Sequence, residues 1–202
     1  MILPVSKTRP AEDIVAVAKA GLQAVGENYL QEALDKIEAL QQLALQWHFI
    51  GPIQSNKTQP IARHFDWVHS VDREKIARRL SEQRPENLAP LNICLQVNIS
   101  REASKSGVMP EDLPELARQV SELPRLRLRG LMAIPAASSD FEAQRASFRA
   151  LREALEQLNT MGLQLDTLSM GMSGDLEAAI AEGATIVRVG TDIFGARAKG
   201  PA

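Results

Sequence analysis

The 202-residue sequence has few of the features that mark specialised classes of protein. Its single cysteine, Cys94, cannot form an internal disulfide, and it lies in an apolar run over residues 91–97, where a reduced, buried thiol is expected. No apolar run approaches the roughly 18 to 20 residues that a membrane-spanning helix needs, and no signal peptide precedes the first apolar segment. These absences favour a cytoplasmic protein.

The sequence also lacks an excess of charge of either sign. Its net charge is −2 and its pI is about 6.0. Such a balance gives no general attraction to phosphate backbones or acidic lipids, so we expect neither nucleic acid nor membrane as a partner. The three histidines, His48, His64 and His69, show no metal-ligand spacing, so no metal site is predicted. We interpret His48, which lies within a predicted strand, as a satisfied core histidine.

What the sequence does contain is a strict alternation of predicted strands and helices. The predicted strands are residues 2–5, 24–28, 47–51, 67–71, 91–98, 126–134, 167–171 and 186–190. The predicted helices between them are residues 11–20, 30–45, 56–63, 73–83, 113–120, 140–161 and 174–182.

This alternation predicts an α/β fold with a parallel sheet, because parallel strands need crossover connections. About 25 residues per strand–helix unit is near the low end for an eight-unit barrel. We therefore predict a single-domain (β/α)8 TIM barrel over residues 1–202. A doubly wound open sheet is the alternative, but no G-x-G-x-x-G follows the first strand to support a dinucleotide site.

A lysine follows the first predicted strand. At the strand period of two, Leu3, Val5 and Lys7 share one face, so the Lys7 ammonium points the same way as two core side chains. Partial desolvation favours the neutral amine, which can attack a carbonyl carbon. The alternative is a lysine that carries its charge to water at the rim of the sheet. The segment by itself favours that alternative.

The loops after the seventh and eighth predicted strands suit a phosphate group. Ser173 and Gly174 follow the seventh strand, and Gly190 and Thr191 follow the eighth. Barrels commonly hold phosphates in these two loops, through helix-end N–H groups, small residues and hydroxyls. Taken singly, Ser173 is typical of a helix N-cap and Gly190 of a turn. Their occurrence in both loops favours phosphate binding.

Arg188 shares a strand face with Ile186 and Gly190. Its guanidinium therefore points either into the barrel or under the helix layer, and it needs a partner in both places because an unpaired buried charge is costly. A phosphate-bearing aldehyde held between Lys7 and the last loop would serve the lysine, the phosphate site and the arginine together.

Several motifs along the chain resemble those of a known family. They are Val5-Ser6-Lys7, Gly26-Glu27-Asn28, Trp47-His48-Phe49-Ile50-Gly51 with Gln54, Asn56 and Lys57, Arg129-Gly130-Leu131-Met132, Gly171-Met172-Ser173, and Arg188-Val189-Gly190-Thr191 with Phe194-Gly195. Together they extend over nearly the whole chain. The sequence resembles the pyridoxal phosphate homeostasis proteins, the YggS-like family, whose single barrel is similar to the N-terminal domain of alanine racemase.

The resemblance implies that pyridoxal 5′-phosphate is bound as a covalent Schiff base on Lys7. It also implies phosphate contacts near Ser173, Gly190 and Thr191, with Arg188 facing the pyridine nitrogen and Asn28 beside the ring. Members usually carry a helical segment before the first strand, and here that segment is expected to be shortened or absent. Asp192 stands where a small or apolar residue is expected, and strand alternation would turn it away from the phosphate.

The implied function is to bind, buffer and deliver pyridoxal phosphate, in support of vitamin B6 and amino-acid balance, without an established catalytic reaction. An arginine only donates hydrogen bonds, so Arg188 would keep the pyridine nitrogen unprotonated and make the ring a weak electron sink. The recipients expected are pyridoxal-phosphate-dependent apo-enzymes. A monomer is expected, because the sequence has no exposed apolar stripe.

Two other functions stay open from the sequence. One is a pyridoxal-phosphate-dependent amino-acid racemase, although racemisation needs a second acid/base opposite Lys7, and nothing places the only tyrosine, Tyr29, there. The other is a Schiff-base aldolase that acts on a phosphorylated sugar and holds no chromophore.

Overall fold

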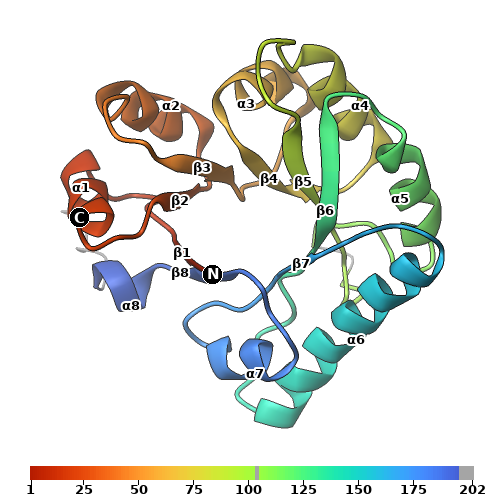
Figure 1. The fold of residues 1–202 in the computed structure, drawn as a ribbon. Coiled ribbons are helices and arrows are strands. Elements are labelled where there is room, and N and C mark those ends of the chain that lie inside the picture. The colour runs from red at the N-terminus through yellow and green to blue at the C-terminus, as the bar shows by residue number, and fades with distance from the viewer. Residues whose placement is uncertain (103–104, 196–202) are drawn as a thin grey trace.

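The computed structural model describes residues 1–102 and 105–195, and its strands and helices alternate along the chain (Figure 1). The strands are β1 Ile2–Pro4, β2 Ala24–Glu27, β3 Gln46–Phe49, β4 Trp67–Val71, β5 Leu91–Gln96, β6 Leu126–Met132, β7 Thr167–Ser169 and β8 Val187–Val189. The helices are α1 Ala11–Lys19, α2 Leu30–Ala39, α3 Thr58–His64, α4 Glu74–Gln83, α5 Leu113–Ser121, α6 Phe141–Thr160, α7 Leu176–Ala181 and α8 Thr191–Phe194. A short 3-10 helix, η1 Ser55–Lys57, leads into α3.

The strands form a closed ring of parallel neighbours. Strands β2 to β7 pair in sequence order, and β1 pairs with β8. Isolated bridges join the two groups, Val5 to Gly26 between β1 and β2, and Ser169 to Ile186 between β7 and β8. Helices α1 to α7 lie outside the ring (Figure 1). The predicted (β/α)8 barrel is confirmed, and the doubly wound alternative is wrong because that sheet would stay open.

Alternate residues of each strand face two different apolar cores, as the period of a strand requires. The larger core lies between the strands and the helices and is built around Phe49, Phe65 and Phe148. The smaller core fills the barrel interior, and it consists of Leu3, Val5, Ala24, Ile50, Trp67, Cys94, Met132 and Ile186. Cys94 is fully buried there, and burial raises the pKa of its thiol to about 12. The expectation of a buried, reduced thiol agrees with this environment.

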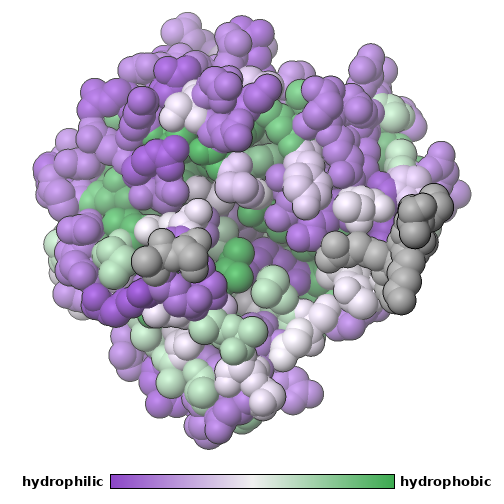
Figure 2. Space-filling model, turned by 180° about the vertical axis from the view of Figure 1, so that it is seen from behind, coloured by the Kyte–Doolittle hydropathy of each residue, from purple (hydrophilic) through white to green (hydrophobic). Residues whose placement is uncertain are grey.

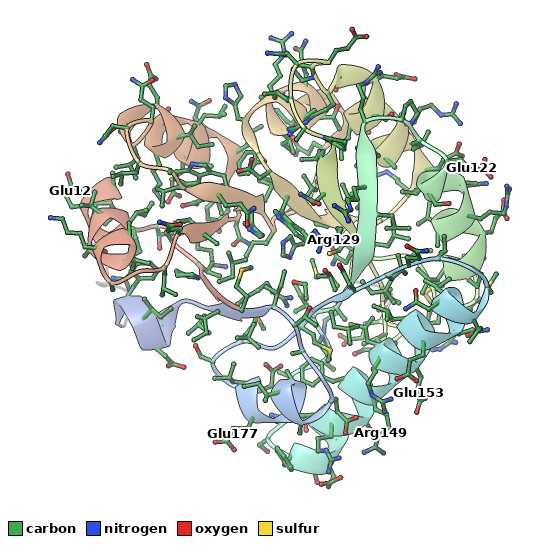
Figure 3. All side chains as sticks on the ribbon, in the orientation of Figure 1. Glu12, Glu122, Arg129, Arg149, Glu153 and Glu177 are labelled. Carbon is green, nitrogen blue, oxygen red and sulfur yellow. The ribbon has the colours of Figure 1, made fainter. Side chains whose placement is uncertain are left out.

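The outer faces of the helices are charged, and the ring of strands also encloses a basic group. Glu12 and Glu153 point outward from α1 and α6, while Arg129 lies within the ring of strands (Figure 3). Its guanidinium sits 4.7 Å from the ring centroid of Trp67 and pairs with Asp166 at 2.8 Å. From the opposite side, hydrophilic residues dominate the periphery of the molecule (Figure 2). Among residues 1–102 and 105–195, no helix combines the length and the apolar character needed to cross a membrane.

Candidate functional site

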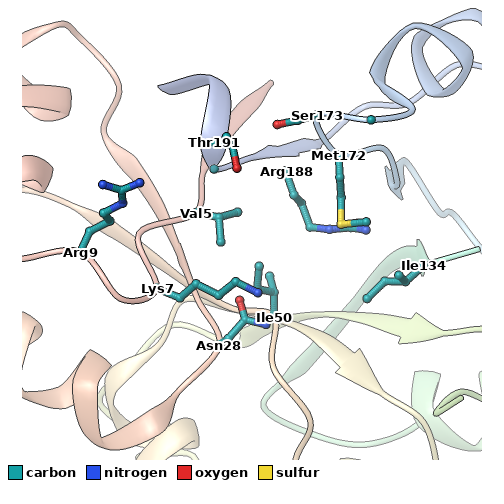
Figure 4. Close-up of a pocket in the computed structure, with 12 residues that line it drawn as sticks. Val5, Lys7, Arg9, Asn28, Ile50, Ile134, Met172, Ser173, Arg188 and Thr191 are labelled. Carbon is teal, nitrogen blue, oxygen red and sulfur yellow. The ribbon is translucent and has the colours of Figure 1, made fainter. Parts of the chain in front are cut away.

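A cavity of about 270 Å³ opens where the strands end. Its walls include all the residues expected to contact a cofactor, namely Lys7, Asn28, Ser173, Arg188, Gly190 and Thr191. Ser173 and Thr191 lie on one side of this space, Lys7 and Asn28 lie across from them, and Arg188 lies between (Figure 4). Segments that are more than 160 residues apart in the sequence therefore meet at one site.

Strand β1 delivers Lys7 to the cavity. Leu3 and Val5 are buried in the barrel interior, so the period of two directs the third residue of that face inward as well. The Lys7 side chain extends toward Asn28 and Ile50 (Figure 4). Asn28 Oδ1 is buried, and no hydrogen bond reaches it from the residues that the structure describes.

A buried ionic cluster lies behind Lys7, between the strands and α2. We call Ser6, Glu27, Glu32 and Lys36 the Lys36 cluster. Lys36 Nζ lies 2.7 Å from Glu27 Oε1, 2.5 Å from Glu32 Oε1 and 2.7 Å from the carbonyl oxygen of Ser6, to which it donates. The Ser6 hydroxyl donates to the same Glu27 oxygen. The residue that precedes Lys7 is therefore fixed through both its side chain and its carbonyl group.

The same cluster also holds the residue after Lys7. The backbone N–H of Thr8 donates to Glu32 Oε1 at 2.6 Å. Thr8 has a φ of 63°, in the left-handed region that a β-branched residue rarely adopts. This conformation turns the chain sharply just beyond Lys7. Contacts on both sides of Lys7 thus set where its backbone lies at the cavity.

Within the Lys36 cluster, the Glu27 carboxyl is fully buried, and burial disfavours its charged form. Burial raises the pKa of its carboxyl above the usual range, and the hydrogen bonds from Lys36 and Ser6 offset part of that effect. Its second oxygen, Oε2, is buried and accepts no hydrogen bond from the described residues. The carboxylate thus depends on Lys36 for most of its compensation.

The loops after β7 and β8 form the opposite wall. Ser173 is not the N-cap residue of α7, because the helix begins at Leu176 and Asp175 precedes it. Asp175 Oδ1 accepts a hydrogen bond from the N–H of Met172 at 2.6 Å, which fixes the turn and leaves Ser173 on the cavity wall. Gly174 lies beside it, also on the wall.

Thr191 begins α8, so the chain after β8 is a helical turn and not extended strand. The expectation that strand alternation governs Asp192 is therefore wrong. Asp192 is exposed and the cavity walls do not include it, so it stays clear of the cavity for a different reason.

Arg188 points into the barrel, which decides between the two orientations that the sequence left open. The residue is only 4% exposed. Its guanidinium donates to Ser169 Oγ at 2.9 Å and to the carbonyl oxygen of Ala133 at 3.0 Å. Burial lowers the pKa of Arg188 to about 10, so the group is still cationic at neutral pH. No carboxylate within the described ranges lies at ion-pair distance from it.

Ser169 is itself bonded to a buried pair of histidines. Its hydroxyl lies 2.7 Å from His69 Nδ1, and His69 Nε2 lies 2.9 Å from His48 Nδ1. His48 Nε2 lies 3.0 Å from Gln46 Oε1. Burial lowers the pKa of His48 to about 3 and that of His69 well below its usual value. The interpretation of His48 as a satisfied core histidine agrees with these contacts, but its connection to Arg188 was not foreseen.

Several other wall residues were missed at the level of sequence. They are Arg9, Ile50, Ile134 and Met172. Their positions just after strands were the available signal. The segment 51–57, which carries part of the family motifs, leads into α3 through η1 and contributes no residue to the cavity walls. Tyr29 is 54% exposed and does not belong to the cavity walls.

Comparison with known proteins shows the family of the chain. The family model described as "Alanine racemase, N-terminal domain" matches residues 2–198. The pyridoxal phosphate homeostasis protein of Pseudomonas aeruginosa PAO1 is 67% identical over 196 residues, which cover 97% of this chain and 84% of that protein. The chain belongs to the pyridoxal phosphate homeostasis protein family. The Escherichia coli K12 member is 55% identical over 199 residues, which cover 97% of this chain and 85% of that protein.

Several solved structures have the same fold as this chain. PipY of Synechococcus elongatus PCC7942, solved with pyridoxal phosphate (PLP) bound, has a TM-score of 0.89 and 39% identity, with 96% of this chain and 92% of that chain covered. Its structure without PLP gives a TM-score of 0.90 at 40% identity, with the same coverage. Alanine racemase of Clostridium difficile 630, in complex with cycloserine, has a TM-score of 0.82 at 12% identity, and covers 98% of this chain and 56% of that chain. That last likeness concerns the fold alone.

Proposed function

We propose that the chain binds pyridoxal 5′-phosphate in the cavity as a Schiff base on Lys7 and acts as a carrier of this cofactor. The neutral amine of Lys7 adds to the aldehyde carbon, and loss of one water molecule leaves the C=N bond. The observation that carries the proposal is the meeting of Lys7, Arg188 and the two loops after β7 and β8 around one cavity. The bound PLP structure of PipY supports the choice of ligand.

The cavity fits the cofactor in size and in chemistry. Its volume of about 270 Å³ lies just below the range for drug-sized ligand sites, roughly 300 to 1,000 Å³, as suits a small cofactor. Asn28 Oδ1 is a buried acceptor with no partner among the described residues, and a ligand hydroxyl would satisfy it. Ser173, Gly174, Gly190 and Thr191 offer hydroxyl and backbone donors to a phosphate. Arg188 offers a cationic donor to the ring nitrogen.

Carriage of the cofactor suits these residues better than catalysis on it. PLP supplies an electron sink to enzymes when its ring nitrogen is protonated. Arg188 cannot give up a proton readily, so it holds a ring nitrogen in the unprotonated form. Tyr29 stands away from the cavity walls and is therefore no candidate for a second acid/base opposite Lys7. We infer a protein that stores PLP and releases it to apo-enzymes.

Visible absorption of the protein mixed with PLP tests the proposal. The parent should develop the absorption band of a protein-bound Schiff base, and Lys7→Ala should abolish it. The matched control is Lys75→Ala, which removes an exposed lysine from α4 and should leave the band unchanged. Reduction with borohydride followed by peptide mapping should place the PLP mass on the peptide that contains Lys7.

Two results would count against the proposal. A parent without a band would mean that the chain does not hold PLP in this way. A band that survives in Lys7→Ala would move the attachment to another lysine. Release of the α-proton of amino acids by the PLP-loaded parent, lost in Lys7→Ala, would favour a racemase over a carrier.

A further inference from the structure

A chain of hydrogen bonds crosses the barrel interior behind the cavity. It runs from Arg188 through Ser169, His69 and His48 to Gln46, with contacts of 2.7 to 3.0 Å. We call Ser169, His69, His48 and Gln46 the His relay. The relay begins at Ser169, next to Arg188 of the cavity wall, and ends at Gln46, the exposed first residue of β3. The four side chains come from three strands, so only the closed barrel brings them together.

One arrangement of protons satisfies every group in the His relay. Arg188 can only donate, so the Ser169 oxygen accepts from it. The Ser169 hydroxyl then donates to Nδ1 of His69, and the Nε2–H of His69 donates to Nδ1 of His48. The Nε2–H of His48 donates to Gln46 Oε1. The reverse direction would leave the Ser169 proton without an acceptor among the described residues, at the cost of a buried, unmade hydrogen bond.

Both histidine rings are held neutral and in place. The ring of His48 stacks on Trp67, with centroids 5.3 Å apart and planes 5° from parallel. Burial lowers the pKa of both histidines, and the charge of Arg188 lowers that of His69 further. The His relay therefore contributes acceptors and dipoles to Arg188 but no counter-charge.

This arrangement has a consequence for the ligand. A carboxylate in place of Ser169 would hold the guanidinium as firmly, but it would cancel the positive charge. A hydroxyl that donates to His69, which in turn donates to His48, accepts a strong hydrogen bond and leaves the charge in place. We propose that the His relay positions Arg188 and keeps its charge available to the ring nitrogen of bound PLP. This inference rests on the proposed function.

The direction of the His relay can be tested without the cofactor. Nitrogen-15 NMR of the histidine side chains at pH 7 should show His48 and His69 as neutral Nε2–H tautomers. It should also show Nδ1 shifts displaced by strong hydrogen bonds. A neutral Nδ1–H tautomer at either ring, or a charged ring at pH 7, would overturn the direction assigned here.

A matched pair of serine variants tests whether the His relay affects PLP binding. Ser169→Ala removes the acceptor of Arg188, whereas Ser70→Ala removes an equally buried hydroxyl next to His69 that donates to Gly51 O and lies outside the relay. Ser169→Ala should weaken PLP binding about tenfold, as expected for loss of a hydrogen bond to a charged group. It should also shift the absorption maximum of bound PLP and the pH dependence of that band. Ser70→Ala should bind PLP within twofold of the parent, with an unshifted band.

A conservative variant separates positioning from simple structural support. Ser169→Thr keeps the hydroxyl and should restore the band of the parent. If the parent binds PLP and Ser169→Ala matches Ser70→Ala in PLP affinity and absorption band, the role of the His relay is overturned. The proposed function then stands. A parent that shows no PLP band would overturn both, while the histidine tautomers would still report on the hydrogen bonds themselves.

Discussion

The Lys36 cluster and the His relay, the two polar clusters beside the cavity, differ in charge. The Lys36 cluster is ionised and holds one cation between two carboxylates, because Lys36 meets Glu27 at 2.7 Å and Glu32 at 2.5 Å. The His relay is neutral and ends on the buried cation of Arg188, whose two acceptors are a hydroxyl and a carbonyl. A cation is paired with carboxylates where the chain beside Lys7 must be held. Arg188 at the cavity has no ion pair among the described residues, and the more distant charge of Asp175 favours its cation.

This difference sets where stability and binding should respond to mutation. Breaking a buried ion pair leaves a bare charge and costs several kcal/mol, whereas replacing an uncompensated buried ion by an apolar group can cost little. The Lys36 cluster should therefore govern folding, and Arg188 should govern affinity for PLP. The three predictions below test that division.

The largest effect is expected in the Lys36 cluster. Lys36→Met should lower the free energy of unfolding by about 3 to 5 kcal/mol, because Glu27 is left buried without its cation. Urea denaturation of the variant beside the parent measures it. The double variant Glu27→Gln, Lys36→Met should recover much of the loss, since no charge is then buried. A loss below about 1 kcal/mol in Lys36→Met would mean that the ion pair adds little to folding.

At Arg188 we expect the opposite pattern, a small effect on the free energy of unfolding and a larger effect on PLP affinity. Arg188→Met should change the free energy of unfolding by less than about 1 kcal/mol, because the desolvation cost of the guanidinium is removed along with its hydrogen bonds. It should weaken PLP binding by about ten- to a hundredfold. Equilibrium unfolding and PLP titration on the same sample measure both. Strong destabilisation with unchanged affinity would reverse the assignment of roles.

The third effect is a difference in the response to acid. The folded-state pKa of His48 is lowered to about 3, below the usual value of 6.5, so the unfolded chain binds more protons as the pH falls. The free energy of unfolding should fall by roughly 1.5 kcal/mol for His48 between pH 6.5 and pH 5. His69, whose pKa is also lowered, should add to this fall.

Glu27 should act in the opposite sense, because its folded-state pKa is raised above 4.5 and protonation favours the folded chain. Urea denaturation from pH 7 to pH 5 should therefore give a shallower slope in His48→Gln and a steeper one in Glu27→Gln than in the parent. Identical slopes in all three proteins would show that neither cluster titrates as its burial requires.

Much of the fold and of the site could be predicted from local patterns. The alternation of apolar runs with helical spacing gave the order of all eight strands, since apolar periodicity is set by the secondary structure itself. Lys7, Ser173 and Thr191 could be placed at strand ends for the same reason, and barrel topology collects strand ends on one face. The conformation after Gly190 could not be predicted, because a four-residue helix has too few positions to show a period.

What the sequence determined by itself is the order of the strands and of the first seven helices, the barrel, and the strand-end residues that meet at the cavity. What only the tertiary structure decided is the pairing of polar groups across strands. Ser169 lies 100 residues from His69 and 19 from Arg188, and no spacing along the chain predicts their contacts. Such contacts depend on register and closure of the barrel, which fix where inward side chains lie relative to one another. The physical reason is that a hydrogen bond is short and directional, whereas a sequence pattern specifies only which face a residue takes.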